Sequence, residues 1–99
     1  FIVDKPSGAY GFCSRCVSPK TGIVLDVYSS EPGMQVYTGN WMSGKLRGKF
    51  DRRYPARSAV CFETQHYPDS PNKPNYPTTL LRPGEVFESR TAFRFGIVE

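Results

Sequence analysis

The chain has 99 residues, and 13 Lys and Arg against 9 Asp and Glu give it a formal net charge of +4. A chain of this length forms at most one domain and buries only about two-thirds of the surface that it exposes when unfolded. No apolar run approaches the roughly 20 residues of a membrane helix, and no signal peptide is visible, so we expect no membrane association. Nine prolines, nine glycines and short apolar runs favour an all-β domain.

The first half of the chain predicts three strands. Residues 10–18 and 23–28 read as strands on either side of a turn at 19–22, which together make a hairpin. A second turn at 30–33 leads to a short strand at 34–37. The segment 41–56 is charged and lacks a sustained period, so we interpret it as a long loop.

The second half predicts strands at 58–63 and 78–81, separated by a proline-rich loop. The last strand gives the clearest alternation, because Glu88, Arg90 and Arg94 share one face. Its other face is apolar and carries Phe87, Thr91, Phe93, Phe95 and Ile97. We expect that face to be buried against a second sheet.

About six strands are too few to cover their own apolar faces and support two long loops as well. The chain also opens on Phe1 in an already strand-like segment, which is typical of a cut through a fold. We therefore expect part of a large antiparallel β-sandwich, with residues 1–99 as its carboxy-terminal portion and the amino-terminal part missing. A complete small sandwich is the alternative.

Two features of the composition suggest binding but favour plainer interpretations. The basic segment contains Lys45, Arg47, Lys49, Arg52, Arg53 and Arg57. No RNP motif or recognition helix accompanies it, so we expect a solvated loop and no nucleic-acid partner. Cys13 and Cys16 have zinc-ligand spacing, but a second pair is missing and an extended strand points them to opposite faces. Packed thiols in a reducing, cytoplasmic setting are the preferred interpretation.

Glu63 is the strongest candidate for a chemical role. It ends an apolar run and enters the stiff loop 64–77, where Tyr67 and Tyr76 are placed to shield it partly. Alternation puts Cys61 on the same face as Glu63 and Phe62 on the opposite face. A carboxylate at such a strand end suits a general base, and equally suits an ion pair with an arginine of the basic segment.

Other polar residues carry weaker signals. Gln35 and Tyr37 share a strand face, and an amide beside a phenol suits hydrogen bonding to a polyhydroxylated ligand. His66, the only histidine, follows Gln65 in a position that suits a loop-stabilising contact as well as a proton donor. The turn positions hold Asn40, Asp69, Asn72 and Asn75, whose side chains we expect to support loop architecture.

Three ordered motifs resemble the aldose 1-epimerase family. They are Gln-Val-Tyr-Thr-Gly-Asn at 35–40, Cys-Phe-Glu-Thr-Gln-His-Tyr-Pro-Asp-Ser-Pro-Asn at 61–72, and Leu-Arg-Pro-Gly-Glu at 81–85. The turns at 18–22 and 31–33 are also similar, so the resemblance covers nearly the whole chain. Trp41 stands where the family usually has Phe. The resemblance implies the carboxy-terminal part of a β-supersandwich.

The resemblance also implies roles. The family's glutamate in Glu-Thr-Gln, which removes the anomeric proton, matches Glu63, and its sugar-contacting glutamine matches Gln35. Its acid histidine, an assisting histidine and a substrate-binding aspartate precede the matched region and are absent here. The implied reaction interconverts the α and β anomers of galactose or glucose without a metal or organic cofactor, and this chain alone is expected to be inactive.

Two rival interpretations remain. One is a non-catalytic carbohydrate-binding module that keeps the sandwich together with Gln35 and Tyr37. The other is a structural or regulatory fragment that pairs with another chain through exposed strand edges.

Overall fold

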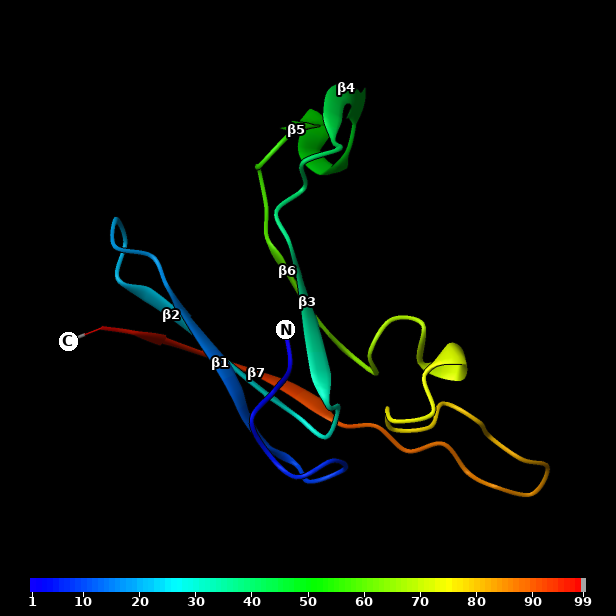
Figure 1. Ribbon diagram of the computed structural model, residues 1–99. Helices are drawn as coiled ribbons and strands as arrows, with labels where there is room; N and C mark the ends of the chain where they lie inside the picture. Colours follow the sequence, from blue (N-terminus) through cyan, green and yellow to red (C-terminus); the bar gives the residue numbers. More distant parts are fainter. Residues whose placement is uncertain (99) are drawn as a thin grey trace.

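The computed structural model describes residues 1–98 as antiparallel strands joined by turns and two short 3-10 helices (Figure 1). The strands are β1 Gly11–Val17, β2 Ile23–Ser29, β3 Gly33–Tyr37, β4 Ser43–Arg47, β5 Arg53–Pro55, β6 Cys61–Gln65 and β7 Thr91–Ile97. The helices are η1 Lys49–Asp51 and η2 Ser70–Asn72. The predicted all-β class is confirmed. No helix among these residues has the length and apolar character that crossing a bilayer requires.

The strands form two packed layers and a separate hairpin. One layer is a three-stranded sheet in the order β1-β2-β7, and the ribbon β3-β6 crosses it (Figure 1). Val27 of β2, Met34 of β3 and Val3 of the first segment are buried between the layers. The partly buried residues around them are Cys13, Leu25, Val36 and Phe62. This contact is the sandwich core.

The predicted first hairpin is confirmed. β1 and β2 pair in antiparallel register, and a bulge between Phe12 and Ser14 leaves Cys13 beside the core. The turn closes with the Gly22 amide donating to the Ser18 carbonyl at 2.8 Å. Gly22 has φ of +72°, a conformation that a residue with a Cβ adopts only at a cost, so the predicted glycine at the end of this turn has a physical reason.

The prediction of a structureless loop at 41–56 is wrong. β4 and β5 form a hairpin that projects away from the two layers (Figure 1). Every residue of this hairpin is exposed except Gly44, which is partly buried. Because neither face of the hairpin is buried in this chain, its sequence has no apolar alternation by which it could be recognised.

The predicted strand at 78–81 is also wrong. This stretch has no ladder partner, and the Leu80 amide donates instead to the Thr78 hydroxyl at 3.1 Å. Flanking prolines at 77 and 83 lack the N–H that a ladder needs. The strand predicted at 58–63 begins later, at Cys61, because a turn in which the Ser58 amide donates to the Pro55 carbonyl precedes it.

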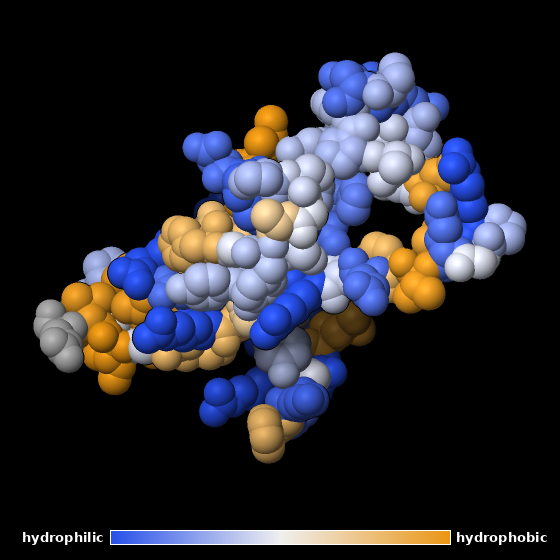
Figure 2. Space-filling model, turned by 90° about the horizontal axis from the view of Figure 1, so that it is seen from below, coloured by the Kyte–Doolittle hydropathy of each residue, from blue (hydrophilic) through white to orange (hydrophobic). Residues whose placement is uncertain are grey.

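The last strand starts at Thr91, so Phe87 lies outside it. Its predicted apolar face is not buried in this chain: Phe93, Phe95 and Ile97 are 51%, 71% and 75% exposed. Figure 2 shows hydrophobic surface gathered at the end of the sheet where β7 ends. The radius of gyration is 16.7 Å, against about 13 Å for a compact domain of this length. The layers are therefore open on this side.

The outer face of the three-stranded sheet holds a buried carboxylate. Asp26 is 4% exposed and receives two hydrogen bonds from the Arg15 guanidinium, at 2.6 and 2.9 Å. Arg94 of β7 is its register partner on the other side. The hydrogen bonds from Arg15, and to a lesser degree the charges of both arginines, hold the pKa of Asp26 below its ordinary value of 3.8 against the opposing effect of burial.

Replacing Asp26 with Asn should therefore destabilise the fold in a pH-dependent way. A depressed folded-state pKa contributes stability above the ordinary value, and that contribution disappears as the pH falls through the lowered value. We expect Asp26→Asn to lower the thermal midpoint by several degrees at pH 7 and to have little effect near pH 2. Asp51→Asn, which breaks an exposed pair with Arg47, is the control and should change little at either pH. If the thermal midpoints of the wild type and Asp26→Asn differ by the same amount at both pH values, the ion pair does not have this role.

Candidate functional site

The pairing of β3 with β6 brings the two predicted site residues together. Gln35 and Glu63 are direct register partners. Partners in an antiparallel pair project from the same face of the ribbon, and both residues are exposed. Their neighbours Met34 and Phe62 project to the other face and pack in the core. Core packing on one face of the ribbon therefore fixes an amide and a carboxylate side by side on the other.

The surroundings of Glu63 differ from expectation in two ways. Glu63 takes part in none of the four ion pairs formed among residues 1–98, so the predicted alternative of an arginine partner is not found. One candidate arginine, Arg57, instead donates to Asn40 at 3.4 Å. Shielding by Tyr67 and Tyr76 is not found either, because the carboxylate-bearing residue is exposed. The Glu63 carboxylate is therefore open on its side of the ribbon.

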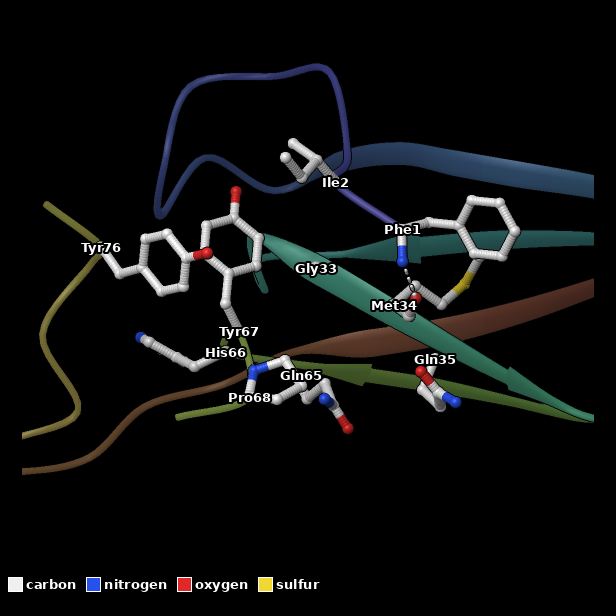
Figure 3. A pocket seen from close by; sticks show the side chains of 10 residues that line it. All are labelled: Phe1, Ile2, Gly33, Met34, Gln35, Gln65, His66, Tyr67, Pro68 and Tyr76. Atoms are coloured by element: carbon white, nitrogen blue, oxygen red, sulfur yellow. Dashed lines mark hydrogen bonds between the residues drawn. The ribbon is translucent and has the colours of Figure 1, made fainter. Parts of the chain in front are cut away.

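The two tyrosines form the wall of an adjacent hollow. Their rings pack edge to face with centroids 5.1 Å apart. The hollow has a volume of about 350 Å³ and is lined by Phe1, Ile2, Gly33, Met34, Gln35, Gln65, His66, Tyr67, Pro68 and Tyr76 (Figure 3). Gln35 belongs to this lining and is also the register partner of Glu63, so one residue borders both the hollow and the carboxylate.

Gly33 allows the hollow to form. A Cβ built on Gly33 would lie 2.9 Å from the ring of Tyr67 and 3.2 Å from the Gln65 carbonyl. The absence of a side chain therefore lets the Tyr67 ring pack against the start of β3 (Figure 3).

His66 makes the loop-stabilising contact that its position suggested. Its Nδ1 lies 2.8 Å from Glu31, a carboxylate that is 6% exposed in the turn between β2 and β3. Sequence reasoning treated Glu31 only as part of a turn. Its burial depends on a partner 35 positions away, and a local pattern cannot reveal such a contact. The only sequence feature that pointed to a special role for Glu31 was its place directly before Pro32-Gly33.

The turn residues support loop architecture, as predicted. Asp69 adopts φ of +63° before η2 and accepts a hydrogen bond from Asn72 at 2.5 Å. Asn40 accepts from Thr38 at 3.0 Å. Asn40, Asp69 and Asn72 therefore bond within their loops, whereas the role of Asn75 stays a prediction.

The cysteines are free and differ in exposure. Cys13 packs against the core, Cys16 is partly buried, and Cys61 is exposed on the Glu63 face. Residues 1–98 contain no group of three or more His, Cys, Asp or Glu arranged to hold a metal ion. The chemistry that the site offers is therefore that of an accessible carboxylate, neighbouring amides and aromatic rings.

Comparison with known proteins agrees with these features. The profile of the aldose 1-epimerase family matches residues 13–94. Galactose mutarotases of Mus musculus and Homo sapiens are 45% and 46% identical over 93 residues, which are 94% of this chain. The aldose 1-epimerase of Escherichia coli K12 is 36% identical over 97 residues, or 96% of this chain.

The chain spans 27% of the length of the two mammalian relatives and 28% of the bacterial one. The match to the family profile nevertheless covers most of its residues, including the strands that carry Gln35 and Glu63. This chain belongs to the aldose 1-epimerase family.

Proposed function

We propose that this chain carries the general base of an aldose 1-epimerase that interconverts the α and β anomers of aldohexoses such as galactose and glucose. The observation that carries the proposal is the register pairing of Glu63 with Gln35 on the open face of the β3-β6 ribbon. Family membership supports it, because relatives that match 94% of this chain are galactose mutarotases.

In this mechanism, Glu63 removes the proton from the C1 hydroxyl while an acid protonates the ring oxygen. The ring opens, the C1–C2 bond rotates, and the two proton transfers reverse on the other face of the carbonyl. The reaction consists of proton transfers, reversible cleavage of the bond between C1 and the ring oxygen, and one bond rotation, so it changes no oxidation state and requires no metal or organic cofactor. A base without a matching acid would leave charge on the departing ring oxygen uncompensated, which keeps the barrier high.

The acid must come from outside residues 1–99. His66 is the only histidine, and its Nδ1 is engaged by the buried Glu31 carboxylate. We infer that the amino-terminal part of the same protein supplies the acid and completes a single sandwich domain, of which this chain is the carboxy-terminal portion. On this proposal, residues 1–99 alone are inactive.

Two features of the fold support that inference. The exposed apolar face of β7, with Phe93 and Phe95, needs a covering layer that this chain does not provide. Ile2 bridges Gly33 in antiparallel register, and Phe1 exchanges backbone hydrogen bonds with Met34. If that register continues, the residue before Phe1 lies opposite Gln35, next to the proposed sugar site.

The hollow next to Gln35 provides the sugar-binding wall. Amides from Gln35 and Gln65 can donate to and accept from hydroxyl groups, and Tyr67 and Tyr76 present aromatic surface. We infer a cytoplasmic location from the three free cysteines, which suit a reducing compartment.

One observation favours the alternative function, a carbohydrate-binding module. The lining of the hollow includes Gln35 and the tyrosines but not Glu63. A protein that only binds sugar would use the hollow and would not need the carboxylate.

Replacing Glu63 with Gln in the full-length protein separates the two functions. We expect kcat for galactose mutarotation, measured by polarimetry, to fall by at least about 100-fold because the base is lost. Galactose affinity, measured by calorimetry, should change little. Glu88→Gln makes the same chemical change at an exposed residue outside the site and should leave kcat unaltered. Retention of full turnover by Glu63→Gln would exclude Glu63 as the base, and a wild-type protein that binds galactose without turnover would favour the binding module.

Replacing Gly33 with Ala tests the hollow. The added methyl group would displace the Tyr67 ring, so we expect KM for galactose to rise by about 10-fold or more. Gly96→Ala is a matched control, because no atom lies within 4 Å of a Cβ built there. If KM for Gly33→Ala equals that of the wild type while the control behaves normally, the hollow does not hold the sugar.

A further inference from the structure

The buried Glu31 carboxylate joins two segments that are distant in sequence. Its Oε1 accepts a hydrogen bond from the Ser89 hydroxyl at 2.5 Å, and its Oε2 lies 2.8 Å from His66 Nδ1. A carboxylate removed from water is costly unless each oxygen has a partner. Here both oxygens have one, so Glu31 draws the segment before β7 and the segment after β6 onto the β2-β3 turn.

A second set of hydrogen bonds leads from the same turn back to β6. The Glu31 amide donates to the Ser29 hydroxyl at 3.0 Å, and that hydroxyl lies 3.0 Å from the hydroxyl of Thr91. Thr91 in turn lies 2.7 Å from the Thr64 hydroxyl. Thr64 follows Glu63 directly and projects to the opposite face of the ribbon.

The end of β6 is therefore fixed at two points, at His66 by the Glu31 carboxylate and at Thr64 by the hydroxyl chain that begins at the Glu31 backbone amide. Glu63 itself is exposed and takes part in none of the ion pairs among the described residues. The position of its carboxylate consequently depends on the position of the β6 backbone. An error of about 1 Å in the placement of a reacting group can cost on the order of 100-fold in rate.

We propose that Glu31 is a positioning residue for the general base: its carboxylate fixes the end of β6 through His66 and Ser89, and its backbone amide anchors the hydroxyl chain to Thr64. This proposal rests on the proposed function, because it assigns Glu31 a part in placing Glu63. Glu31 does not contact the sugar. Its effect is transmitted through the β6 backbone, because Thr64 projects to the core side of the ribbon and His66 follows the strand end directly.

The test is Glu31→Gln in the full-length protein, with kcat and KM for galactose measured by polarimetry. Gln keeps the size of the side chain but cannot accept hydrogen bonds from both partners with full charge assistance. We expect kcat to fall by about 10-fold and KM to stay within about two-fold, because the sugar contacts are retained while the base is misplaced. If Glu31 served only in folding, its replacement would lower the thermal midpoint and the fraction of active molecules, but kcat per folded molecule would stay the same. Titrating the active sites with a tight-binding sugar analogue counts the folded molecules, so that kcat can be expressed per active site.

Two further variants make the result decisive. Glu88→Gln, one position from Ser89 and exposed, should retain wild-type kcat. Ser89→Ala removes a single hydrogen bond made by an exposed residue and should fold even if Glu31→Gln does not, with a fall in kcat of about three-fold. Combining Ser89→Ala with Glu31→Gln should cost less than the product of the two single losses, because both variants weaken the contacts of one side chain.

Wild-type kcat in both Glu31→Gln and Ser89→Ala would refute the positioning role while leaving the proposed function intact. Losses that multiply in the double variant would also refute it. A full-length wild-type protein that does not interconvert anomers would instead refute the proposed function, and the positioning role with it.

Discussion

The antiparallel register between β3 and β6 is the constraint on which the site depends. It places Met34 opposite Thr64 and Val36 opposite Phe62 on the face that meets the three-stranded sheet. The same register leaves Gln35 and Glu63 opposite one another on the open face. A slip of one residue would exchange the two faces, burying the carboxylate and exposing the apolar residues. Packing in the core therefore selects the arrangement that the proposed chemistry needs.

The core between the two layers is small, so apolar packing alone does little to hold the layers together. Of residues 1–98, the buried apolar side chains are Val3, Val24, Val27 and Met34, while much of the apolar surface of β7 is exposed. Hydrogen bonds between polar side chains consequently do much to join the two layers. The contacts of Glu31 with His66 and Ser89, and that of Thr64 with Thr91, connect the sheet to the ribbon at one end. Loss of these hydrogen bonds should therefore change the geometry of the site.

Local patterns predicted the features that depend on alternation or turn chemistry. The first hairpin, the turn at Gly22 and the opposite facing of Phe62 and Glu63 all follow from period two and glycine conformation. The β4-β5 hairpin was missed because neither of its faces is buried, and the expected strand at 78–81 fails because it has no partner. The role of Glu31 could not be predicted, since its partner Ser89 lies 58 residues away. Burial of a charge is decided by such distant contacts.

The central claim is that Glu63 is a base whose acid lies in the amino-terminal part of the protein. The most direct measurement is polarimetry of galactose with residues 1–99 and the preceding part of the protein produced as separate chains, then mixed. The account predicts no turnover from either chain alone, turnover from the mixture, and none when Glu63→Gln replaces the wild-type chain. Turnover by residues 1–99 alone, or by the preceding part alone, would contradict it.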